Sequence, residues 1–523
     1  MKMLALLLAA TLLTGPALAL TPQQARALVI GEAESRIAAL NAVLAGADAQ
    51  TVALIQAIAD NAVKFTETAV FVIKDGKGHD PVSGVEVAVP EAAEEVINNN
   101  QMRGELDAAL ASIKLFSPDG AVRAEAVKTL QGESDEAKLP LIEKALAAEI
   151  AEPIKRALSN VRFAMLLGSA DKAKRLEAAT SLGANGTPAT KTLLIERRKV
   201  ETEIDVRAAI DVALRAIEGR LAWGERLGVV FTGISLGSIL LLVALGLAIT
   251  YGLMGVINMA HGELMMIGAY ATYLIQNLFR AWLPGAFDAY VLVAIPVSFL
   301  AAALVGAALE RSVIRWLYGR PLETLLATWG ISLMLQQSVR SIFGAQNVAV
   351  ENPAWLSGGV DVMSNLTLPL NRIAIVGFAV LVSVGVWALI ARTRLGLFVR
   401  GVTQNRKMAA CMGVNTARID TYAFALGSGI AGLAGCALSQ VGNVGPDLGQ
   451  SYIVDSFMVV VLGGVGQLAG TVYAALGLGV LNKLLEGWQG AVLAKIMVLV
   501  LIVVFIQKRP QGIFALKGRS AEA

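Results

Sequence analysis

The sequence predicts an all-α polytopic membrane protein with about 8–9 membrane segments, some broken or re-entrant. An exported, mainly helical domain containing a β-hairpin precedes them. Three observations predict this fold class. The chain of 523 residues is too long for one ordinary domain. Residues from about 20 to 225 are rich in Ala, Glu, Lys and Arg, whereas apolar runs dominate from about 227 onward. The N-terminus carries a short apolar stretch typical of export. We therefore divide the chain into a signal peptide (1–19), an exported domain (20–222), a transmembrane domain (226–510) and a tail (511–523).

Composition narrows the classes of function. A formal net charge of +3 is too small to indicate a nucleic-acid partner. The two cysteines, Cys411 and Cys436, lie outside the exported domain, so no disulfide framework is expected there. The two histidines, His79 and His261, are far apart in sequence, and we expect no metal site.

Residues 1–19 have the pattern of a cleavable secretory signal. Lys2 supplies the positive start, residues 3–13 supply an apolar run, and Ala-Leu-Ala at 17–19 is a small-x-small cleavage site. An uncleaved anchor is the alternative, but so short a run spans a bilayer poorly. The domain that follows would then be exported, which in a bacterium places it in the periplasm.

Helical periodicity dominates the exported domain. Apolar residues recur at three- and four-residue spacing, and three helices are expected to start after an acid, at Asp119, Asp171 and Asp205. This echo resembles HEAT-like helical pairs, although its spacing is irregular. Residues 65–74 and 82–89 flank a turn-rich segment that contains His79, which predicts a β-hairpin.

Apolar segments follow, and the charges of their loops orient them. Lys and Arg gather at 310–323, at 392–419 and in the tail, which the positive-inside rule places in the cytoplasm. Loops 344–371 and 441–455 are expected to be periplasmic. An exported domain and a cytoplasmic C-terminus require an odd number of crossings, so one segment is re-entrant or 453–507 holds an extra crossing. The segments are 228–250, 256–279, 289–309, 324–343, 372–391, 421–440, 456–480 and 491–507.

The stretch 246–270 carries polar side chains inside an apolar region. Asn258, His261 and Glu263 lie within six residues, which is costly at membrane depth unless the groups face protein or a water-filled path. Glycines interrupt this stretch, as in the discontinuous helices of transporters. We expect it to line a translocation pathway. Polar contacts between helices and a proton relay through His261 and Glu263 are the alternatives.

A second glycine-rich break lies at 463–470. Gly463, Gly464 and Gly466 occupy a position in the second half of the membrane part similar to that of the first break in the first half. Paired breaks of this kind indicate a binding site near the midplane. The alternative is close helix packing through small residues, a spacing that Gly466 and Gly470 also fit.

The basic segment 392–420 is predicted to be a coupling loop. Its residues 405–412 form a short amphipathic helix that ends at Gly413 and places Met408, Cys411 and Met412 on one face. Such a helix docks into a groove of a partner or lies on the lipid surface. The sequence contains no G-x-x-x-x-G-K-[ST] phosphate loop, no H-E-x-x-H and no G-x-S-x-G, so we do not expect an enzyme.

Three stretches carry a family resemblance: GLAITYGLMGVINMAHGELMMIGAY (246–270), RGVTQNRKMAACMGVNTARID (400–420) and ALGSGIAGLAGCALSQVGNVGPDLGQSYIVDSFMVVVLGGVGQLAG (425–470). They resemble the permeases of the branched-chain amino acid type ABC importers, and the resemblance covers about 228–516. The exported extension and the run NVGPDLGQSYIVDSFMVVV are similar to the B-type permease subunits of urea (Urt) importers.

This resemblance implies a multi-pass subunit that lies in the lipid bilayer of the bacterial inner membrane and pairs with a second homologous permease. Two cytoplasmic ATPase subunits would dock on the coupling loop, and a periplasmic solute-binding protein would deliver the solute. The chain itself would bind no cofactor, because ATP and Mg are used by the partner ATPase subunits. The implied coupling residues are Arg400, Asn405, Arg406, Met408, Ala409, Met412 and Gly413.

Urea is the solute that the resemblance implies, with branched-chain amino acids or other short amides as alternatives. Few charges lie within the spans, which favours a neutral solute over a zwitterion. Asp455 is expected at the entry of the pathway or as the cap of the following helix. A membrane-anchored scaffold with an exported binding domain and a passive channel are the competing classes. The expected pathway residues are Asn258, His261, Glu263, Gln450, Asp455, Ser456, Gly463, Gly464 and Gly466.

Overall fold

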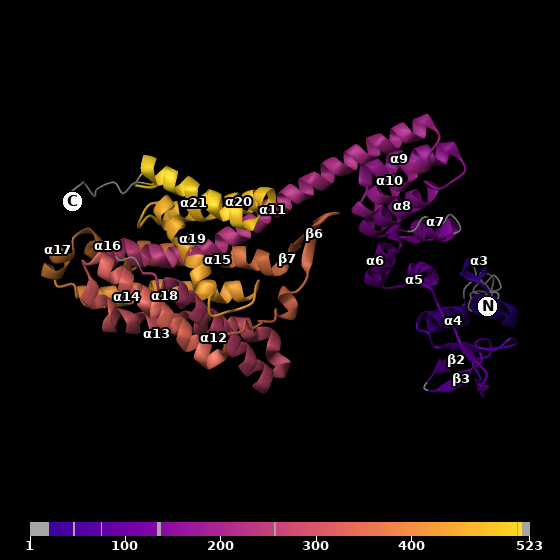
Figure 1. Cartoon of the computed structure of the whole chain (residues 1–523), viewed down its shortest axis with the longest axis horizontal. Coiled ribbons are helices and arrows are strands. Elements are labelled where there is room, and N and C mark those ends of the chain that lie inside the picture. The colour runs from indigo at the N-terminus through magenta and orange to yellow at the C-terminus, as the bar shows by residue number, and fades with distance from the viewer. Residues whose placement is uncertain are drawn as a thin grey trace, which may run out of the picture. The chain divides into compact units, whose positions relative to one another are not determined.

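The structure, a computed structural model, describes residues 20–44, 48–74, 76–132, 138–255, 258–509 and 511–514. The predicted signal peptide and all of the tail beyond residue 514 lie outside the described residues. The chain divides into two compact units, Met1–Ala222 and Trp223–Ala523. Figure 1 labels their elements along the chain.

The first part of the N-terminal unit packs four helices with a small sheet. Their shared core consists of fully buried apolar side chains such as Leu28, Leu40, Ile55, Met102 and Leu106. Capping residues set where three of these helices, α2, α4 and α5, start, because each accepts a hydrogen bond from an otherwise unpaired backbone N–H group. The helices are α2 (Pro22–Val29), α3 (Ala33–Leu44), α4 (Ala49–Ala59) and α5 (Asn100–Lys114).

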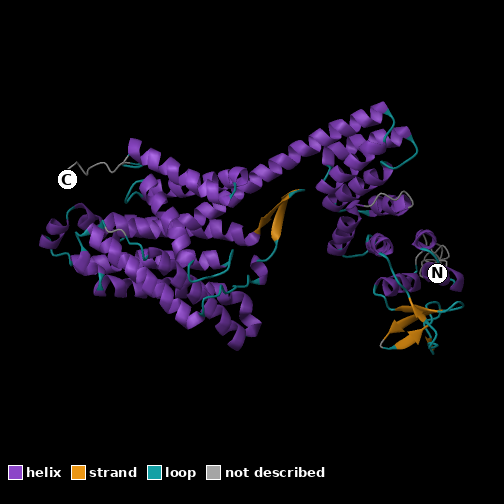
Figure 2. Ribbon diagram, viewed as in Figure 1, coloured by secondary structure: helices purple, strands orange, loops and turns teal. Residues whose placement is uncertain are grey.

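The sheet is antiparallel and larger than the single predicted hairpin, with strand order β4-β3-β2-β1-β5 (Figure 2). Strands β2 and β3 pair up to Lys74 and Lys77, and Gly76 has a φ of 79°, which glycine adopts without strain. His79 therefore lies in a strand, not in a turn as predicted. The strands are β1 (Val63–Phe65), β2 (Val70–Lys74), β3 (Lys77–His79), β4 (Glu86–Val87) and β5 (Glu94–Glu95).

The rest of the N-terminal unit contains a three-helix motif that occurs twice. Asp119 caps α6 and Asp171 caps α9, each by accepting a hydrogen bond from a backbone N–H group of the first turn. Asp205 does not begin a third copy of the motif, contrary to the predicted echo. It lies in the first turn of α11, and the start of α11 is the last helix of the second copy, as α8 is of the first. The helices are α6 (Gly120–Thr129), η1 (Leu130–Gly132), α7 (Leu139–Ala148), α8 (Glu152–Leu166), α9 (Lys172–Asn185), α10 (Pro188–Val200) and the start of α11 (Ile204–Met254).

Each copy of this motif is closed by an ion pair between an arginine and a buried glutamate. In the second copy, Arg175 donates Nε to Glu201 Oε2 at 3.0 Å and Nη2 to Oε1 at 3.2 Å. Nη1 of Arg175 reaches the carbonyl oxygens that precede α9. Glu201 also accepts two backbone N–H groups ahead of α11. Arg123 and Glu149 repeat the arrangement in the first copy. Arg123 lies 52 positions before Arg175, and Glu149 lies 52 positions before Glu201. We call the two pairs the arginine clamps.

The membrane unit is an all-α polytopic fold, as predicted. Six of its described helices are long and apolar enough to cross a membrane; α12, α14 and α19 are not among them. The predicted segment 456–480 is wrong as a single element, because it divides between α19 and α20. The helices are α11, α12 (His261–Trp282), α13 (Tyr290–Ser312), α14 (Pro321–Phe343), α15 (Leu370–Arg392), α18 (Thr416–Ser439), α19 (Leu448–Gly463), α20 (Leu468–Gln489) and α21 (Ala491–Lys508).

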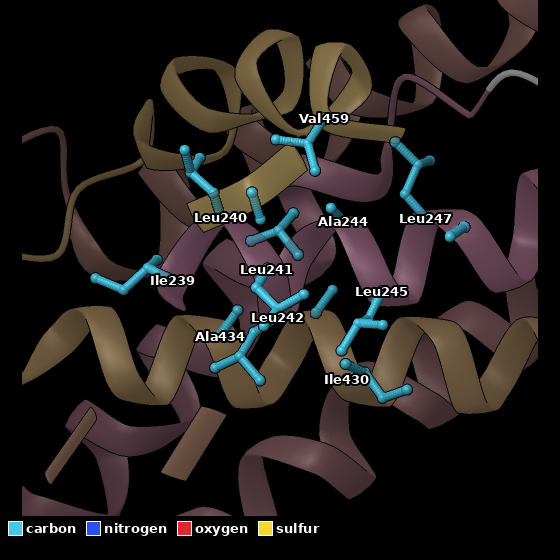
Figure 3. Packing of buried hydrophobic residues seen from close by; sticks show 14 of the residues in the cluster. Ile239, Leu240, Leu241, Leu242, Ala244, Leu245, Leu247, Ile430, Ala434 and Val459 are labelled. Carbon is cyan, nitrogen blue, oxygen red and sulfur yellow. The ribbon is translucent and has the colours of Figure 1, made fainter. Parts of the chain in front are cut away.

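Helix α18 lies at the centre of the membrane unit. Figure 3 shows Ile430 and Ala434 of α18 against the leucine-rich face of α11, with Val459 of α19 on the other side of α11. Short elements connect the long helices, and the hairpin β6–β7 accounts for the second group of strands in Figure 2. These connecting elements are η3 (Pro284–Ala289), η4 (Ile314–Leu317), η5 (Ala354–Leu356), β6 (Gly359–Met363), β7 (Leu366–Pro369), α16 (Arg394–Gln404) and α17 (Arg406–Cys411).

Candidate functional site

The first predicted break separates α11, which ends at Met254, from α12, which begins at His261. The His261 ring lies against α11, with Nε2 3.2 Å from the carbonyl oxygen of Val243. Val243 is part of the apolar run of α11 at 228–250. Helix α12 therefore starts beside the middle of an apolar span and not at its end, so its N-terminus lies at membrane depth.

A second helix begins at the same place. Gly262 and Gly449, the second residues of α12 and α19, lie so close together that a Cβ atom on either would overlap the backbone of the other. The N-termini of α12 and α19 therefore converge. Each N-terminus carries a partial positive charge, although the N–H groups of His261, Glu263 and Leu448 already donate to nearby carbonyl oxygens. Two such ends together favour a carbonyl or carboxylate oxygen.

The three predicted polar residues of the first break are buried around these helix ends. Asn258, His261 and Glu263 are at most 1% exposed. Each has one polar atom with a hydrogen-bond partner and another without: Nδ2 of Asn258, Nδ1 of His261 and Oε2 of Glu263 have none among the described residues. Oδ1 of Asn258 accepts the N–H of Ala260 at 3.1 Å. Buried polar atoms are rarely left unpaired without a reason, so these atoms mark the candidate site.

Helix α14 contributes polar side chains to the site, and these residues were not predicted from the sequence. Oε1 of Glu263 accepts hydrogen bonds from Ser332 Oγ at 2.9 Å and from Gln336 Nε2 at 2.8 Å. The hydroxyl of Thr328 accepts the N–H of Met259 at 3.2 Å. These residues and Thr324 recur at every fourth position and are buried, so they form one inward stripe on the helix. The signal was visible as four-residue spacing within the predicted segment 324–343.

Among the described residues, no hydrogen bond joins the side chains of His261 and Glu263. The His261 ring points to α11, whereas the Glu263 carboxylate points to α14. The arrangement therefore offers no direct proton relay between the two residues. It offers separate acceptors and donors around the two helix ends.

The second predicted break lies between Gly463, the last residue of α19, and Leu468, the first of α20. Gly464 and Gly466 have φ values of 98° and 78°, which turn the chain between the two helices. A Cβ atom at Gly463 would overlap the backbone of Gly470, so close packing accompanies the break. The chain is thus both broken and closely packed at this position.

The two breaks also meet each other. A Cβ atom at Gly252, near the end of α11, would lie 2.8 Å from the Cα atom of Gly466. Helix α19 therefore touches the first break at both ends, through Gly449 at its start and through the turn that follows its last residue. The side of the site opposite α14 is accordingly formed by α19.

The remaining predicted pathway residues lie on α19. Ser456 is fully buried, and its hydroxyl has no partner among the described residues. Gln450 lies in the first turn and is exposed. Asp455 is wrong as a helix cap, because it lies inside α19, where it forms an ion pair with Lys495 of α21 at 3.6 Å. Asp447 occupies the cap position instead.

The predicted coupling loop forms two short helices. Helix α17 covers Arg406–Cys411, with Asn405 as a cap that accepts the N–H of Met408 at 2.9 Å. Met408 and Met412 are 60% and 79% exposed. Gly413, with a φ of 86°, ends the element. Ala409 is half-buried, and Arg400 lies exposed on α16. The structure therefore has a short helix with an exposed apolar face at this position.

In the described part of the chain, no three His, Cys, Asp or Glu side chains lie close enough together to hold a metal ion. The polar groups at the helix ends are instead arranged as single hydrogen-bonding groups. Such an arrangement suits a small organic solute.

The membrane unit is similar to known membrane transport proteins. Residues 229–506 match the family described as branched-chain amino acid transport system, permease component. The high-affinity branched-chain amino acid transport system permease protein LivH of Salmonella typhimurium is 30% identical over 293 residues, which cover 54% of this chain and 93% of that protein. LivH of Escherichia coli gives the same figures. BraD of Pseudomonas aeruginosa is 29% identical over 287 residues, which cover 54% of this chain and 93% of that protein. No solved structure matches the chain significantly.

Proposed function

The chain belongs to the family of branched-chain amino acid transport system permease components, and from this premise we propose that it is the transmembrane subunit of an ATP-driven importer for urea. It is a transport subunit and not an enzyme. The proposal extends the family assignment to the solute, the partner subunits and the orientation in the membrane.

One observation carries the proposal: two helix N-termini converge at membrane depth beside three buried, half-satisfied side chains. Urea presents one carbonyl oxygen and four N–H donors. The oxygen suits the partial positive charge at the N-termini of α12 and α19 and the unpaired Nδ2 of Asn258. The N–H groups suit the free Oε2 of Glu263 and Nδ1 of His261, which accepts when Nε2–H donates to Val243.

A branched-chain amino acid is the second candidate, and the names of the relatives favour it. Its carboxylate would lie at the helix N-termini, and its ammonium group would need a compensating charge. Glu263 is the carboxylate available for this in the site, but one of its oxygens already accepts two hydrogen bonds from α14. A neutral solute places no such demand on the site.

The partners follow from the division of labour in such importers. A second homologous permease completes the pathway, two cytoplasmic ATPase subunits dock on the exposed face of α17 and use ATP and Mg, and a solute-binding protein delivers the solute. The basic loops 310–323 and 392–419 lie in the cytoplasm, as does the C-terminus. The N-terminal unit then lies in the periplasm of a bacterial cell.

Uptake in cells tests the proposal. The gene is deleted, and uptake of labelled urea and labelled leucine is measured at micromolar concentration, with the chain restored as the control. We expect urea uptake to be lost and to return only when the partner ATPase is active. Loss of leucine uptake alone would transfer the assignment to amino acids, and uptake that persists without the ATPase would contradict an importer.

A further inference from the structure

A buried network of charged side chains lies where α13 ends and α18 begins. Glu310 in the last turn of α13 and Asp420 in the second turn of α18 are both 0% exposed. Buried carboxylates are stable only when charged or polar partners compensate them. Their partners come from η4, α18 and α17.

Glu310 joins three segments. Its Oε1 accepts the hydroxyl of Tyr318 at 3.1 Å. Its Oε2 accepts the hydroxyl of Thr421 at 2.6 Å and Nη2 of Arg315 at 3.4 Å. Burial raises the pKa of the Tyr318 hydroxyl, so this group keeps its proton and donates it. Helix α13, the segment after it and helix α18 are therefore held together at one carboxylate.

Arg406, the first residue of α17, holds the other carboxylate. Its Nη1 donates to Asp420 Oδ1 at 3.3 Å, and its Nη2 donates to Oδ2. The same guanidinium group lies over the ring of Tyr318, 5.2 Å from the centroid. Tyr318 thus contacts Arg406 through its ring and Glu310 through its hydroxyl, which links the two carboxylates.

The rest of α17 faces outward. Met408, Cys411 and Met412 are exposed; the Arg406 side chain is also 42% exposed, but its guanidinium group reaches the buried carboxylate of Asp420. Separating Arg406 from Asp420 would leave the buried Asp420 carboxylate without this partner. Arg406 therefore links the start of α17 directly to α18.

Helix α18 leads from this network to the candidate site. Gly432 and Gly435 pack directly on the backbone of α12 at Gly268 and Met265. Met265 lies two residues after Glu263. A shift of α18 along its axis therefore reaches the first turns of α12, where the half-satisfied side chains lie.

We propose that Arg406, Asp420, Tyr318 and Glu310 act as a coupling relay, a set of positioning residues that transmits movement of α17 to α13 and α18. The inference rests on the proposed function, because it takes α17 as the element that an ATPase subunit moves. It goes further by assigning the path of that movement inside the chain.

The test uses the complete importer in proteoliposomes and measures solute transported per ATP hydrolysed. Asp420→Asn removes the charge that holds Arg406, and we expect this ratio to fall about fivefold or more while the ATPase subunits remain bound. Arg418→Gln is the matched control, since Arg418 is exposed on the same helix and should leave the ratio unchanged. Arg406→Lys, which keeps the charge, should retain more coupling than Arg406→Gln.

Tyr318→Phe keeps the ring under Arg406 and removes the hydrogen bond to Glu310, so it tests the relay with little change to the fold. We expect a smaller fall in the ratio. A normal ratio in both Asp420→Asn and Tyr318→Phe would overturn the relay, as would a normal ratio in Tyr318→Phe if Asp420→Asn failed to assemble. Absence of ATP-driven transport in the wild-type complex would instead overturn the proposed function.

Discussion

A buried carboxylate of the N-terminal unit and the buried polar side chains at the first break of the membrane unit are paired to different extents. In the N-terminal unit, the carboxylate of Glu201 accepts hydrogen bonds from Arg175, Arg197 and two backbone N–H groups. In the membrane unit, Asn258 and Glu263 are equally buried but each keeps an atom without a partner. A fully paired network fixes one structure, whereas an incompletely paired one is costly unless another molecule completes it. The comparison therefore distinguishes polar groups whose hydrogen bonds are complete from those with an atom still available to another molecule.

Arg175→Ala should have the largest effect on stability. It leaves Glu201 buried without its main partner, and breaking a buried pair in this way costs about 3–5 kcal/mol. Hydrogen exchange of the full-length protein, followed in peptides from 169–221, measures the loss as a fall in the free energy of opening.

Lys172→Met is the matched control for this change. Lys172 lies three residues away and pairs with Glu203 and Asp205, but all three side chains are exposed to solvent. An exposed pair contributes little, so exchange should not change measurably. Equal effects of the two substitutions would remove the distinction between the arginine clamps and ordinary surface ion pairs.

Acid should weaken both arginine clamps together. Hydrogen bonds from Arg123 lower the pKa of Glu149 to about 2. Burial alone would raise the pKa of Glu201, but hydrogen bonds from Arg175, Arg197 and the backbone lower it to about 2 as well. The pKa of such a carboxylate is near 4.5 in the unfolded chain, and at any pH above this value the ionised carboxylate stabilises the folded state. This stabilisation is lost as the pH falls from 4.5 towards the folded-state pKa of about 2.

Calorimetry of the full-length protein checks this pH dependence. The transition that Arg175→Ala lowers should have a constant midpoint between pH 7 and 5 and a falling one below pH 4.5. In the double variant Glu149→Gln/Glu201→Gln, most of this decrease of the midpoint below pH 4.5 should be absent. A midpoint that declined between pH 7 and 5 would point to other groups.

Ser456→Ala should have a smaller effect, and on transport only. The Ser456 hydroxyl has no partner among the described residues, so its removal breaks no contact and thermal stability should be unchanged or slightly higher. Solute uptake should fall about fivefold, which corresponds to one lost hydrogen bond of about 1 kcal/mol.

Ser428→Ala provides the comparison. Ser428 is equally buried, but its hydroxyl donates to the carbonyl oxygen of Phe424 within α18. Its removal should leave uptake unchanged. If Ser428→Ala lowered uptake as much as Ser456→Ala, an unpaired hydroxyl would have no special meaning in this unit.

Sequence patterns predicted the parts of the fold that depend on local periodicity. The long apolar helices follow from uninterrupted apolar runs, and α17 follows from Asn405 and Gly413, which start and end it. The polar residues of the first break were predicted because Asn258 and Glu263 are unusual inside an apolar stretch. Each of these signals lies within a few residues of sequence.

The remaining features depend on contacts between distant segments. Convergence of α12 and α19 requires Gly262 to meet Gly449, which no spacing predicts. The polar stripe of α14 consists mainly of Thr and Ser, which barely change hydropathy. The arginine clamps join residues 26 positions apart, such as Arg175 and Glu201, although an offset comparison of the sequence with itself would have found their repetition.

Accessibility of Ser456 tests most directly whether unpaired polar atoms mark the solute pathway. Cys411 and Cys436, the two native cysteines, are replaced by serine, and Ser456→Cys or, as control, Ser428→Cys is introduced into the complete importer. A small charged thiol reagent is then applied during ATP-driven turnover, with and without solute. We predict that position 456 reacts and that solute protects it, while position 428 stays unreactive. Equal reactivity of the two positions, or no reaction at 456 in any state, would contradict the account.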